Sequence, residues 1–565
     1  MTENNHLPET IVALTERSST EFTDRPAVSF AFEKPLSYQE WFGKILLLSS
    51  ALKKSGLKRG DKVGLLAENS PAWGIAYMAI VRAGGIAVPI LPDFTEADIS
   101  HILTDAEVEI LFTTKPQLPK IYEIDTHKIR HLITLDNYQE KLPKENSPLL
   151  TVTSLNEIME KAATRKTKPK ESLQATKHPH GDDLASIIYT SGTSGHSKAV
   201  MLSHRNLCSN VISASSIIEV TPDWTFLSIL PLSHTYEFTI GFLLPIISGA
   251  RIVYTDRPPT PAILEKICRA EKPSILCMVP LVMEKIYKKR VLPGINRSRL
   301  LQVCMKLPLT RRLILKKIGR KLLNFFGGNL KLIAIGGAAL NPEVEHFFTE
   351  AGFPYLTGYG LTEASPLISG GPFGQKNIAI TSSGKPIPGV EVKIVNSRSD
   401  TGIGEIHARG PNIMRGYHKN PTLTKDTIDH DGWLATGDLG HLDPDGNLFI
   451  RGRNKNVIVL THGENIYPES IEEKINSSIK VVESLVIERN NHLEAMVHLD
   501  YDQIDQKTRG YSEQQQLNYI NSLLKELQKD INGQLPVYSQ ISQITERREP
   551  FIKTATHKIK RYLYT

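Results

Sequence analysis

In the first quarter of the chain, segments with the hydrophobic pattern of strands alternate with segments that carry the signals of helices. Short apolar runs predict strands at 27–30, 63–67, 87–90, 110–113 and 132–135. Between the first two runs, Ser37 and Glu40 have the spacing of a helix capping box. Ser70-Pro71 predicts the start of a second helix, because proline is tolerated in a first turn, and Gly84-Gly85 predicts its end. This βαβ order predicts a mainly parallel sheet covered by helices.

The pattern changes further along the chain. Residues 160–182 are polar and lack periodicity, which predicts an exposed connector. Strands and helices then alternate again to about residue 370. From Gly384 onward, short alternating segments and the turn at Asp445-Gly446 predict antiparallel hairpins. Beyond Arg453 the pattern predicts a smaller α+β unit.

Composition narrows the class of protein. The chain has 565 residues, too many for one hydrophobic core, so we expect two or more domains. Its 40% hydrophobic and 22% charged residues are typical of a soluble globular protein. With a net charge of only +7, we predict no nucleic-acid partner. Four cysteines lack metal-site spacing and predict free thiols in a reducing compartment: Cys208, Cys268, Cys277 and Cys304.

The chain contains no sequence typical of export or membrane insertion. Its first residues have neither a basic start nor an apolar core, so no signal peptide is expected. The apolar stretch 239–247 is interrupted by Gly241 and Pro245 and is too short to span a bilayer. We therefore expect a cytoplasmic protein.

Residues 189–200, Y-T-S-G-T-S-G-H-S-K-A-V, have the chemistry of a phosphate-binding loop. They follow a predicted strand at 184–188 and precede a helix that Ser203 can cap. Glycines allow a tight turn, hydroxyls add donors and the lysine adds charge. The candidate ligands are Thr190, Ser191, Gly192, Thr193, Ser194, Gly195 and Lys198. A plain flexible loop is the structural alternative, and the P-loop NTPase spacing is absent.

This loop resembles the phosphate loop of the adenylate-forming superfamily, which includes acyl-CoA synthetases, luciferases and peptide-synthetase adenylation domains. Further segments resemble the family's motifs in the same order along the chain. They are L-P-L-S-H-T-Y-E at 230–237, G-G-A-A at 336–339, G-Y-G-L-T-E-A-S-P at 358–366, T-G-D at 436–438, G-R-N-K at 452–455 and K-T-A-T-H-K-I-K-R at 553–561.

The resemblance implies an α/β fold with two domains. Residues 1–452 would form a large N-terminal domain of helix-covered mixed sheets plus a distorted β-barrel. Residues 453–456 would form a hinge, and 457–565 a small, mobile α+β lid domain.

The resemblance also implies the nucleotide-binding residues. Thr193 and Glu363 would hold Mg²⁺, which prefers hard oxygen ligands. Asp438 would accept hydrogen bonds from the ribose hydroxyls, a suitable task for a carboxylate. The small residues Gly337, Ala338 and Ala339 would lie against adenine. The remaining nucleotide contacts would come from Tyr359, Gly360, Thr362, Arg453 and Lys455.

Two further residues would act on the acid substrate. His234 would lie beside the acyl tunnel, although a lone histidine is more often structural. Lys558 would reach into the site for adenylation. The sequence departs from the family at His557, where glycine is usual, at Asn456, where the hinge acid is usual, and at His196, where proline is frequent.

The implied reaction has two halves and uses ATP, Mg²⁺ and coenzyme A. A carboxylate attacks the α-phosphate, and a thiol then converts the acyl-adenylate into a thioester. L-P-L-S-H-T-Y-E at 230–237, G-E-N-I-Y-P-E at 463–469 and the insert at 285–331 look most like the long-chain fatty-acid branch, so we expect a medium- or long-chain fatty acid. Acyl carrier protein as acceptor, or release of the adenylate alone, are open alternatives. A non-catalytic nucleotide-binding protein is the alternative from a different class.

Residues 285–331 contain no Asp or Glu, and 309–326 predict a basic amphipathic helix. One interpretation is a surface helix whose apolar side packs inward. The other is contact with an anionic membrane, at its inner face, or with an acidic carrier protein.

Overall fold

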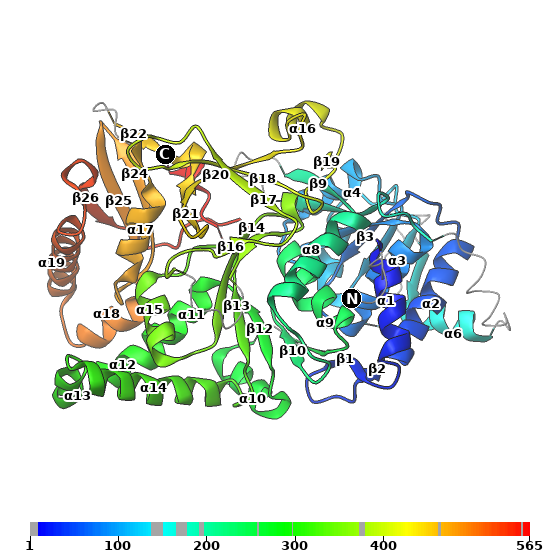
Figure 1. Ribbon diagram of the computed structural model, residues 1–565, viewed down its shortest axis with the longest axis horizontal. Coiled ribbons are helices and arrows are strands. Elements are labelled where there is room, and N and C mark those ends of the chain that lie inside the picture. Colours follow the sequence, from blue (N-terminus) through cyan, green and yellow to red (C-terminus); the bar gives the residue numbers. More distant parts are fainter. Residues whose placement is uncertain are drawn as a thin grey trace.

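The computed structural model, shown in Figure 1, describes most of the chain. The described residues are 9–136, 151–164, 178–190, 197–256, 259–296, 298–371, 379–460, 465–554 and 558–564. Within these parts, no helix combines the length and the apolar content needed to cross a lipid bilayer.

The first sheet contains the predicted βαβ units. Its eight strands have the order β19-β9-β8-β4-β3-β5-β6-β7, and all neighbours from β8 to β7 are parallel. The strands are β3 (Lys62–Leu66), β4 (Ile86–Ile90), β5 (Ile110–Thr113), β6 (His131–Thr134), β7 (Thr151–Ser154), β8 (Leu184–Thr190), β9 (Lys198–Ser203) and β19 (Gly416–Tyr417). The strands predicted at 63–67, 87–90, 110–113 and 132–135 are therefore confirmed to within one residue at each end, and the strand predicted at 184–188 continues to Thr190.

Local signals start and end the helices as predicted. Ser37 and Glu40 form the capping box of α2 (Tyr38–Lys54). Ser70 caps α3 (Pro71–Ala83), and Gly84 ends this helix in the left-handed region with φ 91°. Ser203 caps α8 (His204–Ile217). These caps satisfy backbone N–H groups that a helix terminus leaves unpaired.

The second sheet has nine strands in the order β16-β15-β14-β13-β12-β10-β11-β1-β2. Neighbours from β14 to β1 are parallel. The strands are β1 (Pro26–Phe30), β2 (Leu36–Ser37), β10 (Thr225–Ser228), β11 (Arg251–Tyr254), β12 (Ile275–Met278), β13 (Leu332–Ile335), β14 (Tyr355–Gly360), β15 (Leu367–Gly370) and β16 (Lys385–Pro386).

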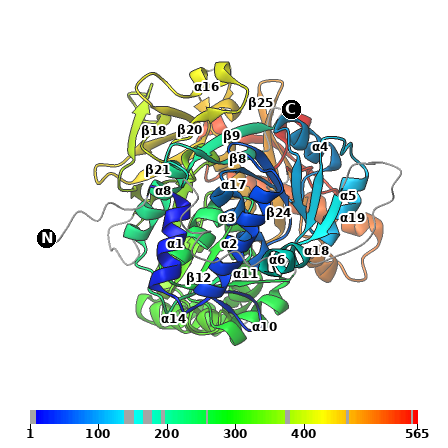
Figure 2. The same cartoon turned by 90° about the vertical axis from the view of Figure 1, so that its right-hand side faces the viewer.

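Helices cover both faces of each sheet: one layer lies between the two sheets, and one layer lies on each outer face. One apolar core contains residues of both sheets together with α1 (Ile11–Glu21), α2, α3 and α8, so these helices lie between the sheets. A second core packs α10 (Pro261–Glu271), α11 (Pro280–Ile286), α14 (Pro308–Phe325) and α15 (Pro342–Ala351) on the outer face of the nine-stranded sheet. A third packs α4 (Glu96–Asp105) and α5 (Leu118–Tyr122) on the outer face of the eight-stranded sheet (Figure 2).

The later part of the chain forms two smaller units. The segment after Gly384, where antiparallel hairpins were predicted, contains a four-stranded antiparallel sheet of β17 (Glu391–Val395), β18 (Gly404–Arg409), β20 (Leu434–Leu442) and β21 (Leu448–Arg453). The α+β unit at the C-terminus has its own core. It contains α17 (Pro468–Ser477), α18 (Tyr501–Lys507), α19 (Glu513–Asn532), β24 (Val481–Arg489), β25 (His492–Leu499) and β26 (Ile541–Glu546).

Two local predictions were wrong. The start of the predicted connector 160–182 belongs to a helix, α6 (Leu155–Thr164), because Leu155 and Met159 are buried on its inner side. Residues 165–177 lie outside the described residues. The end of the predicted phosphate loop is also regular structure, since Lys198 begins β9 and pairs with Thr190 of β8.

Candidate active site

The phosphate loop connects two antiparallel strands. Thr190 ends β8, Lys198 begins β9, and the Thr190 hydroxyl donates to the Lys198 carbonyl oxygen at 3.4 Å. This strand–loop–strand arrangement differs from the strand–loop–helix arrangement of a P-loop NTPase. The predicted ligands Ser191, Gly192, Thr193, Ser194 and Gly195, together with His196, lie outside the described residues.

Glu363 lies in a short 3₁₀ turn, Thr362–Ala364, directly after β14. The Tyr417 hydroxyl donates to Glu363 Oε1 at 2.9 Å. The Tyr417 ring also lies under the Lys198 ammonium, with 5.1 Å from Nζ to the ring centroid. Tyr417 therefore links the predicted metal carboxylate to the lysine of the phosphate loop.

The sequence analysis missed Tyr417. It lies in R-G-Y-H, a segment without the turn or charge pattern that identified the other motifs. Strand β19 brings it into the site by pairing with β9, where Tyr417 lies opposite Val200. An aromatic residue in such a segment is a weak sequence signal, and its place in the site becomes evident only from this strand pairing.

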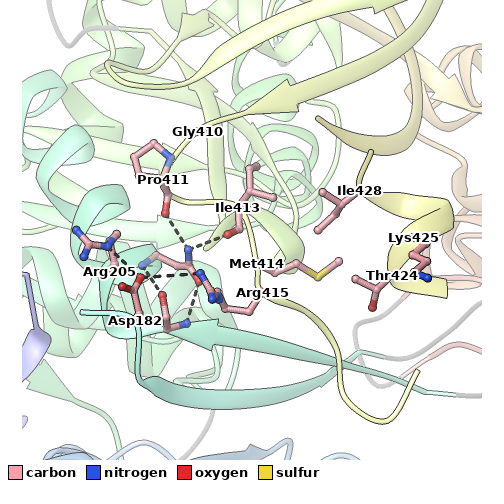
Figure 3. A pocket seen from close by; sticks show the side chains of 12 residues that line it. Asp182, Arg205, Gly410, Pro411, Ile413, Met414, Arg415, Thr424, Lys425 and Ile428 are labelled. Carbon is pink, nitrogen blue, oxygen red and sulfur yellow. Dashed lines mark hydrogen bonds and ion pairs between the residues drawn. The ribbon is translucent and has the colours of Figure 1, made fainter. Parts of the chain in front are cut away.

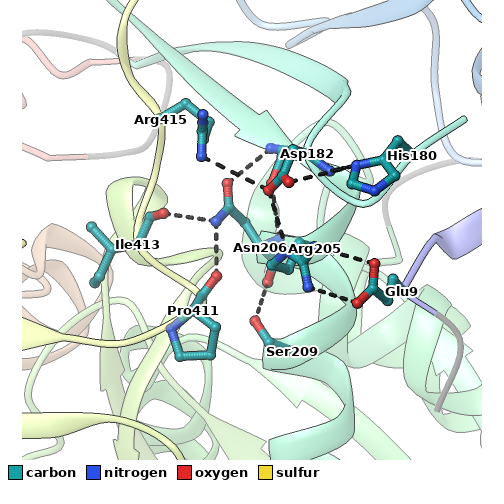
Figure 4. Close-up of polar contacts among 10 residues, drawn as sticks. Glu9, His180, Asp182, Arg205, Asn206, Ser209, Pro411, Ile413 and Arg415 are labelled. Atoms are coloured by element: carbon teal, nitrogen blue, oxygen red, sulfur yellow. Dashed lines mark hydrogen bonds and ion pairs between the residues drawn. The ribbon is translucent and has the colours of Figure 1, made fainter. Parts of the chain in front are cut away.

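Buried asparagines hold the backbone around Glu363. Asn206 on α8 donates from Nδ2 to the carbonyls of Pro411 at 2.8 Å and Ile413 at 2.7 Å (Figure 4). Asn412 donates to the carbonyls of Ala364 at 2.9 Å and Leu367 at 3.1 Å. Since unpaired buried carbonyls are costly, these amides fix the turn that carries Glu363.

Gly360 is required by close packing at the same turn. A Cβ added there would lie 2.0 Å from the carbonyl oxygen of Pro366, well inside any tolerated contact. Thr362, the next motif residue, is buried.

Asp438 is held by two partners. Arg453 Nε lies 3.1 Å from Asp438 Oδ1, and the Tyr359 hydroxyl donates to Oδ2 at 2.8 Å. The pairing of β20 with β21 places Asp438 directly opposite Arg453. Burial, together with the Asp438 charge, raises the pKa of Tyr359, so its hydroxyl stays protonated and donates. Two predicted nucleotide residues thus orient a third.

The C-terminal Lys558 lies in the same electrostatic environment as these groups. Burial lowers the pKa of Lys558; the Arg453 charge adds to this shift, and Asp438 and Glu363 oppose it. By solvent accessibility, Lys558 is an exposed residue. The structure therefore brings Lys558 of the small unit to the carboxylates of the large one.

Lys455 joins this cluster. Burial lowers its pKa, and the charges of Arg453, Lys198 and Lys558 lower it further, while Asp438 opposes the shift. The site therefore gathers four cations around two carboxylates. A site with this excess of positive charge is suited to a polyphosphate anion.

The Lys558 charge of this cluster acts on His234, and Tyr236, two residues further on, packs at the start of the small-residue strip. Burial lowers the pKa of His234 to about 4, and the Lys558 charge contributes, so the imidazole is neutral at physiological pH. Gly337, Ala338 and Ala339 are exposed directly after β13. Tyr236 packs against the preceding Gly336, where an added Cβ would lie 3.3 Å from its ring.

The residues present fit a magnesium ion bound mainly by phosphate and water. No group of three or more His, Cys, Asp or Glu could hold a metal ion within the described ranges. Glu363 offers one carboxylate, and Mg²⁺ usually takes only one or two protein ligands beside phosphate and water. The second predicted ligand, Thr193, lies outside the described residues.

A cavity of about 410 Å³ opens elsewhere, near the N-terminus of α8 (Figure 3). None of the predicted site residues lines it. Its wall contains Arg205, which pairs with Glu9 at 2.9 Å and with Asp182 at 3.2 Å (Figure 4). Because these charges already pair with one another, we interpret this cavity as part of the scaffold that anchors α8.

The family model described as AMP-binding enzyme matches residues 15–418. The long-chain-fatty-acid–CoA ligase ACSBG1 of Rattus norvegicus is 30% identical over 483 residues, which cover 80% of this chain and 65% of that protein. The chain thus spans less than two thirds of that relative's length. The probable acyl-activating enzyme 16, chloroplastic, of Arabidopsis thaliana is 28% identical, covering 96% of this chain and 86% of that protein. The long-chain-fatty-acid–[acyl-carrier-protein] ligase AEE15 of the same plant is 28% identical, covering 83% of this chain and 73% of that protein.

Solved structures have the same fold. The ATP-bound MatB from Rhodopseudomonas palustris has a TM-score of 0.74 and 23% identity, covering 99% of this chain and 98% of that one. The anthranilate CoA ligase AuaEII in complex with anthranoyl-AMP has a TM-score of 0.78 and 21% identity, covering 100% of this chain and 98% of that one. The predicted fold class, a large α/β N-terminal domain with a small α+β C-terminal domain, is confirmed.

Proposed function

The chain belongs to the family of AMP-binding enzymes, and from this premise we propose that it activates a carboxylic acid with ATP and transfers the acyl group to a thiol. One observation carries the proposal. Lys558, from the end of the chain, lies in one charge cluster with Glu363, Asp438 and Arg453 of the large domain. A catalytically decayed nucleotide-binding protein would not need to keep this set together.

In the first half-reaction, a carboxylate oxygen of the acid attacks the α-phosphorus of ATP, and pyrophosphate leaves. Lys558, Lys198 and Lys455 would offset the negative charge on the phosphates, and Asp438 would orient the ribose. Mg²⁺, held through Glu363 and Thr193, would neutralise phosphate charge when bound. His234, neutral at physiological pH, would position the carboxylate without competing for the phosphates.

In the second half-reaction, the thiolate of the acceptor attacks the acyl carbonyl carbon, and AMP leaves with the former acyl oxygen. The acceptor thiol loses its proton before this attack. We propose that residues 457–565 then rotate about a hinge at 453–456 and withdraw Lys558, which makes room for the thiol. Residues 454–456 form a short 3₁₀ turn, where Asn456 Nδ2 donates to Glu469 Oε1 at 2.5 Å.

For the substrate we propose a medium- or long-chain fatty acid, with coenzyme A as acceptor. The supporting observation is the 30% identity to a long-chain-fatty-acid–CoA ligase. Acyl carrier protein is the alternative acceptor, because a relative at 28% identity is named as a ligase for that carrier.

Hydroxylamine trapping of acyl-adenylate across a panel of acids tests this function. We expect acid-dependent release of pyrophosphate that is strongest with fatty acids, and Lys558→Ala should abolish it. The same variant should still form thioester from supplied acyl-AMP. Repeating the second step with coenzyme A and with acyl carrier protein identifies the acceptor. No acid-dependent pyrophosphate from the parent would favour the non-catalytic alternative.

We further propose that α13 (Arg299–Cys304) and α14 contact an anionic lipid surface. The inner side of α14 is buried through Leu315, Leu322 and Phe325, so inward packing is only part of its role. Other apolar residues of this segment are well exposed: Leu300, Val303, Leu307, Leu309 and Leu313. Beside them the exposed face of α14 carries Arg312, Lys316, Lys317, Arg320 and Lys321.

These observations fit a membrane better than a purely acidic protein partner. Exposed leucines can enter the interface, and each nearby cation contributes about 1 kcal/mol at an anionic surface. A flotation assay with anionic vesicles tests the contact with two double variants. Binding should weaken when Leu309→Ser and Leu313→Ser are combined, and also when Arg312→Gln and Lys316→Gln are combined. Val537→Ser is the matched control, because Val537 is 85% exposed in the other domain. Unchanged flotation of both variants would refute the contact.

A further inference from the structure

Lys288 reaches from the large domain into the C-terminal domain. It lies in a π-helical turn, Tyr287–Val291, between α11 and α12 (Leu292–Asn296). Its ammonium donates to the carbonyl oxygens of Asn476 at 2.5 Å, Ser478 at 3.1 Å and Val481 at 3.4 Å. All three donor hydrogens of one lysine are thus directed at the other domain.

Two of the three acceptors, Asn476 and Ser478, lie at the C-terminal end of α17, and Val481 begins the next strand, β24. The last carbonyls of a helix have no partner inside the helix, and the helix dipole favours a cation at this end. Burial lowers the pKa of Lys288, while Glu284, Glu343 and Asp500 oppose the shift and favour the charged form. The contact is therefore a half-buried, charge-assisted cap across the domain boundary.

Helix α17 also holds the segment that carries Lys558. Glu472, one turn before Asn476 on α17, forms an ion pair with Arg561. Arg561 also donates to the carbonyl of Val486 at 3.2 Å. The backbone of Lys558 is in turn fixed to Thr554, whose N–H donates to the Lys558 carbonyl at 2.8 Å. A continuous set of contacts therefore joins Lys288 to Lys558.

We propose that Lys288 is a positioning residue for adenylation: it holds α17, and through it Lys558, in the orientation that places Lys558 beside Asp438 and Glu363. The inference rests on the proposed function, in which the C-terminal domain adopts another orientation for the thiol step. Rotation of that domain would have to break all three hydrogen bonds. Lys288 therefore favours the adenylation orientation over the thiolation orientation.

Lys288→Met tests the proposal, because methionine keeps much of the apolar stem and removes the donors. We expect adenylation, measured by hydroxylamine trapping, to fall roughly ten- to a hundredfold, the range that hydrogen bonds to a charged group account for. Thioester formation from supplied acyl-AMP should be unchanged or faster. Lys289→Met is the matched control, since the neighbouring Lys289 is exposed. Lys288→Arg should recover most of the adenylation rate.

Equal loss of both half-reactions, or no loss of adenylation, would overturn the proposal. If Lys288→Met does not fold, Lys288→Gln removes the charge while keeping a polar side chain, and the same two rates decide. Lys558→Ala is measured in parallel. If that variant does not lose adenylation selectively, the proposed function itself fails. If it does and Lys288→Met behaves like the parent, only the inference about Lys288 fails.

Discussion

Replacing Tyr417 by phenylalanine should specifically weaken the use of magnesium. Phenylalanine keeps the ring under the Lys198 ammonium, 5.1 Å away, and removes only the hydroxyl that donates to Glu363 at 2.9 Å. Burial raises the pKa of Tyr417, and the Glu363 charge adds to this, so in the parent the hydroxyl is protonated and donates throughout the working range of pH. The variant therefore isolates one hydrogen bond.

The size of the effect follows from the kind of bond. A hydrogen bond to a charged group contributes about 1.5–3 kcal/mol, and losing a partner that orients a metal ligand typically costs about 10–100-fold in metal affinity. We expect the Mg²⁺ concentration for half-maximal adenylation to rise roughly tenfold or more. Tyr417→Leu removes the ring as well, so the additional loss of the cation–π contact should raise it further.

The assay is the rate of hydroxylamine-trapped adenylation against Mg²⁺ concentration at saturating acid and ATP. Tyr359→Phe is the matched control, because it removes an equivalent hydroxyl from Asp438. That control should raise the KM for ATP and leave the Mg²⁺ dependence unchanged. If Tyr417→Phe has the Mg²⁺ dependence of the parent, Tyr417 does not orient a metal ligand and the reasoning is wrong.

Three more predictions concern stability and pH. Gly360→Ala should lower the free energy of unfolding by about 1–3 kcal/mol because of the backbone clash, whereas Gly43→Ala, in open space within α2, should raise it by about 0.5–1 kcal/mol; thermal unfolding measures both. Burial raises the pKa of Glu237 to about 8 from its usual 4.5, so the folded state retains a proton that the unfolded state loses. Stability should therefore fall from about pH 4.5 to pH 8, and a Glu237→Gln variant that unfolds with an equally steep pH dependence would contradict this. Adenylation should fall at alkaline pH as Lys558, with its lowered pKa, loses its proton, and Lys558→Arg should move that limb to higher pH; an unmoved limb would exclude Lys558 as its source.

The sequence was sufficient for features that depend on residues close together along the chain. The capping box at Ser37 and Glu40, the proline start of α3 and its end at Gly84 were all predicted, because each is formed within one or two helical turns. The motif order also indicated which residues belong to one site, and Asp438, Arg453 and Tyr359 do lie together. The prediction of an exposed connector at 160–182 was wrong at its start. Burial of Leu155 and Met159 favours a helix there, and the polar side of that helix does not predict it.

Only the tertiary structure decided how that site is held. Tyr417 reaches Glu363 across 54 residues because β19 pairs with β9 in a sheet whose order local sequence does not specify. Lys288 reaches Asn476 across 188 residues although their helices belong to separate hydrophobic cores, so this pairing depends on how the two domains meet. Hydrophobic patterning determines which face of an element is buried, but not which distant element covers it. The residues proposed to bear the chemistry were therefore visible in the sequence, and the residues proposed to position them were not.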